Sequence, residues 1–235
     1  MDNFKYKVNE SAKFYNDSFL NFDFKLAEFN YLTIKDYFNG ETALELGPAI
    51  GQMTKYIVPH FDKIHVVEGA KDLLEQIPKY NNVIKHLSYF EEFKTDIKFD
   101  TIIMGHVLEH IEYPVEILKS VYEWLSDDGV LIVTVPNAKS LHRLAAVEMG
   151  LLGSEYELNS RDHELGHYRV YDSQTLLNDA IQAGYNIKAS GSIFLKPVSN
   201  KQIEDNWDER MIDGFFRLGK KFPHNGAEIF IVCTK

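Results

Sequence analysis

The chain has 235 residues, a hydrophobic share of 45% and a charged share of 26%, values typical of a soluble globular protein that argue against a disordered chain. Its 25 basic and 35 acidic residues give a formal net charge of −10, which disfavours nucleic acid and anionic membrane surfaces as partners and favours a small molecule. Because Cys233 is the single cysteine, an intramolecular disulfide and a cysteine-based zinc cluster are both excluded.

The first ten residues, MDNFKYKVNE, lack the apolar core of a signal peptide, and no later apolar run is long enough to cross a bilayer. A single cysteine also suits a reducing compartment. We therefore expect a cytoplasmic protein without a membrane segment.

Residues 1–40 alternate aromatic and charged side chains, which predicts one or two helices that end at Gly40 and cover the rest of a single domain. The apolar residues that recur there at roughly helical distances are Phe14, Leu20, Phe24 and Phe29.

In residues 41–136, short β-rich runs alternate with amphipathic helices, a pattern typical of a parallel sheet covered on both faces. The clearest helix lies in PVEILKSVYEWLSDDG: it starts at Pro114, and Gly129 supplies the turn after it. The residues predicted to share its apolar face are Leu118, Val121, Tyr122 and Leu125. The runs predicted as strands are Thr42–Leu46, Ile64–Glu68, Val83–Leu87, Phe99–Met104 and Val130–Val135.

Residues 137–171 lose this period and gain histidines, glycines and charges. An irregular stretch of that length is more often a functional lid than a simple connector, so we predict a lid insertion. Residues 172–235 should complete the sheet with a helix from about Ser173 to Ala183 and strands in YNIKASGSIFL and AEIFIVCT. The polar segment 199–225 between those strands is expected to pack on the sheet edge, cover the substrate or form a dimer contact.

The run ELGPAIG ends the first predicted strand with two glycines, Gly47 and Gly51. Glycine accepts unusual backbone dihedrals and has no side chain in the way, so such a turn lets backbone amides approach a ligand. Glu68 lies 23 residues after Glu45, at the end of the next predicted strand. A carboxylate there can accept both hydroxyls of a ribose.

Two runs, ALELGPAIGQMTKYI and VVEGA, resemble the first two cofactor motifs of class I methyltransferases that use S-adenosylmethionine (SAM). The turn pattern of that family is acidic-x-Gly-x-Gly-x-Gly, and the matching positions here are Glu45, Gly47, Ala49 and Gly51. Only Ala49 departs from it, and we expect its extra methyl group to be tolerated because the other anchors are present.

Later motifs extend the resemblance, which is close over about residues 40–137 and follows the order of elements throughout the chain. FDTIIMGHVLEHIEYP resembles the fourth-strand motif, and LSDDGVLIVTVPN resembles the helix end, turn and fifth strand. The implied fold is α/β and Rossmann-like: a seven-stranded, mostly parallel sheet with helices on both faces and an antiparallel C-terminal strand, supplied here by AEIFIVCT.

The resemblance also implies SAM as cofactor, S-adenosyl-L-homocysteine (SAH) as product, and a set of binding residues. In this scheme Glu45 and Gly47 lie near the amino-acid portion, Glu68 holds the ribose, Ser88 and Tyr89 flank the adenine, and Gly105 and His106 lie beside the methionine end. The full implied set is Glu45, Gly47, Pro48, Ala49, Gly51, Glu68, Gly69, Ser88, Tyr89, Gly105 and His106. The ordinary alternatives are a capped or paired surface carboxylate at Glu45 and an ordinary strand end at Ser88 and Tyr89.

Three histidines are candidate bases, because a hydroxyl acceptor must lose its proton as the new bond forms and histidine titrates in the useful range. His110 follows the fourth strand, while His163 and His167 lie in RDHELGHYRVY, which resembles a segment of methyltransferases that act on sugars and other small metabolites. Arg169 and Tyr171 would then contact the acceptor or the lid. Alternatively, these histidines stabilise the fold or the lid, and His65, His86 and His142 are expected to be structural or surface residues.

A divalent metal is the less favoured alternative, with Glu109, His110 and either His163 or His167 as ligands and Glu112 to complete the set. The predicted site therefore contains no metal.

The sequence thus predicts a SAM-dependent methyltransferase acting on a hydroxyl of a small polar metabolite, such as a sugar or a sugar-linked intermediate. Methylation of a small amine or amide is the close alternative, and a homodimer is left open. Two other classes of protein are alternatives to a methyltransferase: a catalytically silent binding subunit and a nicotinamide-dependent oxidoreductase. The latter is disfavoured because Tyr56, Tyr80, Tyr89 and Tyr122 all lack a lysine four residues later.

Overall fold

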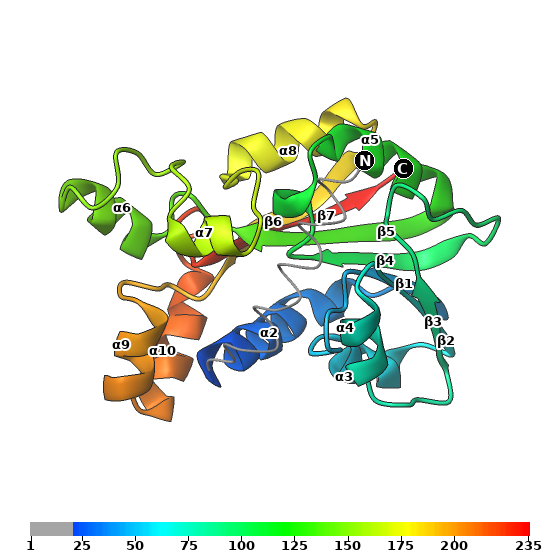
Figure 1. Ribbon diagram of the computed structural model, residues 1–235, viewed down its shortest axis with the longest axis horizontal. Helices are drawn as coiled ribbons and strands as arrows, with labels where there is room; N and C mark the ends of the chain where they lie inside the picture. Colours follow the sequence, from blue (N-terminus) through cyan, green and yellow to red (C-terminus); the bar gives the residue numbers. More distant parts are fainter. Residues whose placement is uncertain (1–20) are drawn as a thin grey trace.

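The computed structural model describes residues 21–235, so the predictions at Phe14 and Leu20 lie outside the described residues. Seven strands form one sheet in the order β3-β2-β1-β4-β5-β7-β6 (Figure 1). Their bounds are Thr42–Leu46 for β1, Lys63–Glu68 for β2, Val83–Leu87 for β3, Phe99–Gly105 for β4, Leu125–Pro136 for β5, Asn186–Ile193 for β6 and Glu228–Thr234 for β7.

The strands β1 to β5 pair in parallel, whereas β7 runs antiparallel to both β5 and β6. This confirms the predicted mostly parallel sheet and its reversed C-terminal strand. The strand β5 begins five residues before the predicted Val130, because Leu125 pairs with Phe99 across an irregularity in the β4–β5 ladder. The prediction that Leu125 belongs to the preceding helix was therefore wrong, since that helix ends at Trp124.

Helices cover both faces of the sheet (Figure 1). On one face, α5 (Pro114–Trp124) and α8 (Ser173–Gln182) bury apolar side chains such as Leu118 and Leu176. The helices on the other face are α2 (Asn21–Ile34), α3 (Thr54–Ile57), α4 (Lys71–Gln76), α9 (Asn200–Asn206) and α10 (Glu209–Gly219). Because the central strands are buried on both sides, they read as continuous apolar runs.

The segment 199–225 packs next to α2 through aromatic rings. Phe29 of α2 stacks on Phe216 of α10 with ring centroids 4.1 Å apart, and it also stacks on Phe194 at 5.6 Å. This is the packing role expected from the apolar face of the segment. Short 3-10 turns occur at Lys35–Tyr37 (η1), Val58–His60 (η2) and Leu108–His110 (η3).

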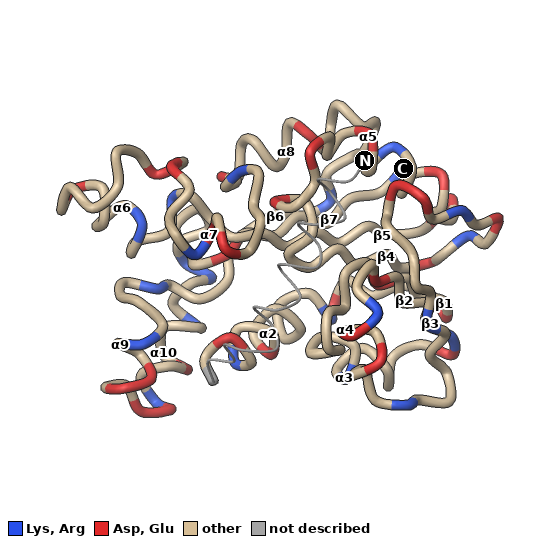
Figure 2. The backbone as a smooth tube through the Cα atoms, in the orientation of Figure 1, with Lys and Arg blue, Asp and Glu red and all other residues tan. Residues whose placement is uncertain are grey.

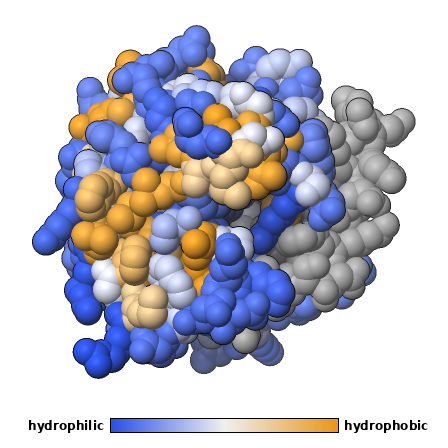
Figure 3. Space-filling model, turned by 90° about the vertical axis from the view of Figure 1, so that its left-hand side faces the viewer, coloured by the Kyte–Doolittle hydropathy of each residue, from blue (hydrophilic) through white to orange (hydrophobic). Residues whose placement is uncertain are grey.

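The 137–171 segment contains two helices that the sequence did not predict, α6 (Leu141–Glu148) and α7 (Ser160–Glu164). Its two ends meet, since Asn137 and Tyr171 form a parallel bridge and Ala138 N donates to Tyr171 O at 2.7 Å. Figure 1 shows it beyond the carboxyl ends of the parallel strands, and Figure 3 shows apolar and polar side chains mixed on this side of the molecule. Among the helices between residues 21 and 235, none is long and apolar enough to span a membrane.

Candidate active site

The turn after β1 adopts the left-handed backbone that its glycine pattern requires. Gly47 has φ +67° and Gly51 has φ +84°, and a Cβ at Gly47 would come within 2.9 Å of Val107 Cγ2. Ala49, at the position where the family pattern has glycine, also has a positive φ, of +48°. The alanine therefore adopts the left-handed conformation that glycine would have at this position, although its Cβ makes that conformation strained.

The two acidic residues of the motifs lie at the ends of adjacent strands. Glu68 accepts hydrogen bonds from Ala49 N at 3.2 Å and from Ala70 N at 2.9 Å, and burial raises the pKa of its carboxyl group. Glu45 accepts a hydrogen bond from Thr54 Oγ1 at 2.6 Å, and burial raises its pKa to about 7. The hydrogen bond from Ala49 N thus links the glycine turn to Glu68.

The remaining predicted cofactor residues flank these two carboxylates. Gly69 follows Glu68, and Ser88, directly after β3, donates its backbone N–H to Glu68 O at 3.1 Å. Ser88 Oγ donates to Tyr89 O at 2.9 Å. The structure therefore aligns these motifs along the carboxyl ends of β1, β2, β3 and β4, the edge at which open parallel sheets bind ligands.

A cavity of about 280 Å³ opens from the turn toward the 137–171 segment. The turn contributes Glu45, Gly47, Pro48 and Ala49 to its wall, and Gly105 lines it at the end of β4. Side chains of His106, His110 and His167 also line it. Of the predicted cofactor residues, Gly51, Glu68, Gly69, Ser88 and Tyr89 lie outside this wall.

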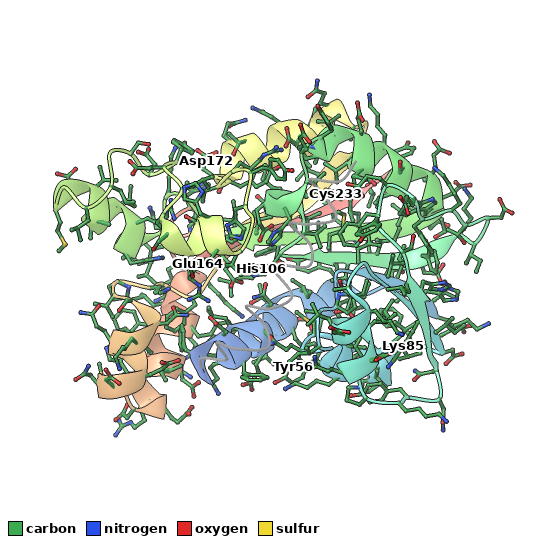
Figure 4. All side chains as sticks on the ribbon, viewed as in Figure 1. Tyr56, Lys85, His106, Glu164, Asp172 and Cys233 are labelled. Carbon is green, nitrogen blue, oxygen red and sulfur yellow. The ribbon has the colours of Figure 1, made fainter. Side chains whose placement is uncertain are left out.

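His106 links three elements and has a positive φ of +56°. Its Nδ1 lies 3.3 Å from Glu109 Oε1 in η3, and its Nε2 lies 3.1 Å from Glu228 Oε1 at the start of β7. Burial opposes a charge here, but Glu228 and Glu109 outweigh it and raise the pKa of His106 well above its ordinary value. The ring is therefore a protonated connector, unsuited to accept a proton at neutral pH (Figure 4 labels it near the centre of the molecule).

His110 and His167 meet edge to face, with ring centroids 4.6 Å apart. Burial lowers the pKa of His110 to about 4, so its ring is uncharged at neutral pH. His167 is buried, and its Nδ1 lies 3.1 Å from Asp162 Oδ1. When Nδ1 donates to this carboxylate, Nε2 carries the free lone pair.

Asp162 is itself held by several groups. Its Oδ2 accepts from Arg143 Nη1 at 3.1 Å and from Asn159 N at 2.9 Å. Burial opposes its charge, but the bonds from His167 and Asn159 and the charge of Arg143 lower its pKa to about 2. Asp162 and Arg143 were missed in the sequence, although an aspartate five residues before His167 in RDHELGH was an available signal.

The other predicted acceptor residues lie elsewhere. His163 is exposed and does not line the cavity. Arg169 Nη2 donates to Glu112 O at 2.9 Å, and the buried Tyr171 donates its hydroxyl to Asp179 at 2.8 Å. Both line a second cavity beside α5 and α8, so the structure brings His110 and His167 together but not these three residues.

Donor atoms of Glu109, His110 and His167 lie within 4.8 Å of one another, so this group could hold a divalent ion. Glu112, which the sequence suggested as a further ligand, is exposed and lines the second cavity.

The sheet order is that of the Rossmann-like methyltransferase fold. A family model described as a methyltransferase domain matches residues 23–190, and the chain belongs to this family. This membership sets aside the nicotinamide-dependent alternative.

Several known proteins similar to the chain are described as methyltransferases. The chain is 26% identical over 137 residues to (S)-coclaurine N-methyltransferase from Papaver somniferum, a match that covers 54% of the chain and only 39% of that relative. A SAM-dependent methyltransferase of Thermotoga maritima, described as a possible histamine N-methyltransferase, superposes with a TM-score of 0.65 at 19% identity, covering 97% of this chain and 99% of the other. The N-methyltransferase NodS from Bradyrhizobium japonicum, in complex with SAH, gives a TM-score of 0.60 at 11% identity, covering 98% and 97%.

Proposed function

We propose that this methyltransferase transfers the methyl group of SAM to a hydroxyl of a small polar acceptor, with His167 as general base. The observation that carries the proposal is the bond between His167 Nδ1 and the Asp162 carboxylate at 3.1 Å. A carboxylate on one nitrogen fixes the tautomer and leaves the other nitrogen able to accept a proton. Methylation of an oxygen requires such an acceptor, because the hydroxyl proton must leave as the bond forms.

When bound at the glycine turn, SAM supplies a methyl group on a sulfonium. The acceptor oxygen would bond to the methyl carbon as the carbon–sulfur bond broke, and His167 Nε2 would accept the hydroxyl proton. The products are the methyl ether, SAH and an imidazolium that the Asp162 carboxylate stabilises. The rest of the rate enhancement comes from aligning the acceptor oxygen with the methyl group and from excluding water, as expected for an in-line displacement.

The chain's own residues hold the two reactants in this scheme. We assign Glu45 and Gly47 to the amino-acid portion of SAM and Glu68 to its ribose, in keeping with their alignment along the sheet edge. The uncharged ring of His110, packed against His167, faces the acceptor without competing for the proton that His167 takes.

Methylation of a small amine is the second candidate. The relatives named above are described as N-methyltransferases. The cavity wall also carries the buried carboxylate of Glu109, whose Oε1 lies 3.3 Å from His106 Nδ1 while its Oε2 has no partner among the described residues. A buried carboxylate of this kind can pair with a cationic amine before the amine loses its proton. An acceptor panel of hydroxyl compounds and amines, read out by SAH release, separates the two candidates.

The base is tested by His167→Gln, with His163→Gln as the matched control from the same segment. We expect His167→Gln to lower kcat by about 100-fold or more and to leave SAH affinity unchanged, because general-base catalysis contributes 10²–10⁴-fold. The exposed His163 should tolerate substitution. Asp162→Asn should lower kcat as well, because the amide can donate to Nδ1 and favour the wrong tautomer.

If the His167→Gln and His163→Gln variants had equal turnover, His167 would not be the general base. Activity should also persist in excess chelator. Loss of activity in chelator that an added divalent ion restores would instead make Glu109, His110 and His167 metal ligands.

A further inference from the structure

Lys196, which follows β6, is a buried cation on the wall of the active-site cavity. Only 9% of the surface of Lys196 is exposed to solvent. Within residues 21–235, its Nζ has no ion-pair or hydrogen-bond partner. A buried charge without a partner is unfavourable, so such a group signals a ligand.

The carboxylates around Lys196 are already engaged with other groups. Asp23 pairs with Arg161 Nη2 at 2.9 Å and accepts from Asn200 Nδ2 at 2.8 Å. Glu228 pairs with His106 and accepts from Asn30. Asp23 and Glu228 lie near enough to interact with the charge of Lys196, but among the described residues neither forms a direct ion pair with its ammonium group.

A second polar group beside Lys196 also lacks a partner. His142 Nδ1 is buried without a hydrogen-bond partner in the described part of the chain, and the ring lines the same cavity. The two residues are joined by the backbone, since His142 N donates to Lys196 O at 3.0 Å. Burial lowers the pKa of His142 to about 3, so its ring is neutral and one nitrogen can donate a hydrogen bond.

We infer that Lys196, with His142, binds an anionic oxygen group, carboxylate or phosphate, carried by the methyl acceptor. An ammonium and a neutral N–H donor form two strong hydrogen bonds to such a group. Figure 2 shows basic and acidic segments mixed at the end of the molecule where α6, α7 and α9 lie, so the inference depends on the two buried side chains and not on the charge of the surface. The inference rests on the proposed function and narrows its substrate class to hydroxyl compounds that carry a negative charge.

The anion site is tested directly by calorimetric titration of the SAH-saturated chain with inorganic phosphate and, separately, with acetate. We expect at least one of these anions to bind the wild type, and to bind Lys196→Met at least tenfold more weakly. Lys201→Met is the matched control, since Lys201 is nearby in the chain but its side chain is 78% exposed. Lys196→Arg should retain much of the binding because it keeps the charge.

SAH affinity, measured on each variant, shows whether the fold is intact. The stronger of the two titrants identifies phosphate or carboxylate as the bound group. Absence of anion binding to the wild type, or equal binding by Lys196→Met and the wild type, would overturn the inference.

The acceptor class is tested with matched pairs of hydroxyl compounds, glucose 6-phosphate against glucose and glycerate against glycerol, by SAH release. We expect the anionic member to have a KM at least tenfold lower, and Lys196→Met to remove that difference while kcat changes less. If the neutral compound of each pair had the same KM as the anionic one and turnover still depended on His167, the inference would be overturned but the proposed function would stand. Turnover of amines alone would overturn the hydroxyl function, whereas the anion titrations would still report on Lys196.

Discussion

Ala49 shows how a single methyl group is accommodated in the cofactor turn. Its φ of +48° lies in the region that glycine adopts at little cost, whereas an alanine there is strained by roughly 1–2 kcal/mol. The conformation is retained because the backbone N–H of Ala49 is anchored to Glu68 Oε2. Gly47, two residues earlier, has no comparable tolerance, since Val107 occupies the space of its absent Cβ.

We therefore expect Ala49→Gly to have a much smaller effect on stability and SAH binding than Gly47→Ala. Ala49→Gly relieves strain but makes the unfolded chain more flexible, so the free energy of unfolding should change by less than about 1 kcal/mol, with SAH affinity retained. Gly47→Ala should lower the free energy of unfolding by about 1–3 kcal/mol and weaken SAH binding. Urea unfolding and calorimetry measure both quantities, and similar losses in the two variants would contradict this account of the turn.

Glu45 should make SAH binding depend on pH. Burial raises its pKa to about 7, so the carboxylate that we assign to the cationic amino group of SAH forms only as pH rises through neutrality. SAH affinity should accordingly increase by about tenfold between pH 6 and pH 8, as the ionised fraction grows. The variant Glu45→Gln should bind SAH more weakly and lose most of this dependence. A wild-type affinity that is flat or falls over this range would remove Glu45 from that role.

Among the elements, the end of β4 and the start of β7 are joined through one side chain. His106 at the end of β4 contacts Glu109 of η3 and Glu228 of β7, and both carboxylates are buried. The reversed strand is thus fixed to the centre of the sheet by charge as well as by its ladder with β5.

His106→Ala should consequently be one of the more destabilising substitutions in the chain. Removing the imidazolium leaves two buried carboxylates without their cation, which costs about 3–5 kcal/mol when a buried pair is broken. Adding Glu228→Gln to that variant should recover part of the loss, because it removes one of the uncompensated charges. Thermal or urea unfolding measures both steps, and a loss below about 1 kcal/mol in the single variant would show that the pairing contributes little.

The sequence predicted elements well where burial leaves a clear pattern. The strands β1, β2, β4 and β5 appear as apolar runs because both faces of the sheet are covered there. The helices α5 and α8 have regular apolar faces and terminal residues that mark their ends. By contrast, α7 has five residues and is fixed by the capping box of Asn159 with Asp162, so it has no apolar period to detect.

Over the whole molecule, the parts of the site that follow a strand were predictable and those assembled from distant segments were not. The glycine turn, Glu68 and His110 follow strands in recognisable motifs. Lys196 and Glu228 come from the last third of the chain, and Asp23 from its beginning, so their meeting at one cavity depends on the strand order near the sheet edge. No local pattern reports that order.

The bridge between Asn137 and Tyr171 has a consequence for how this enzyme can diversify. Because the 137–171 segment leaves and rejoins the sheet at one point, its length and sequence can vary without shifting the register of β5 or β7. Extending an already closed loop adds little entropic cost, about 0.6 kcal/mol for each doubling of its length. Insertions and substitutions in this segment away from Asp162 and His167 can therefore reshape the wall of the cavity while the sheet and the glycine turn after β1 stay the same.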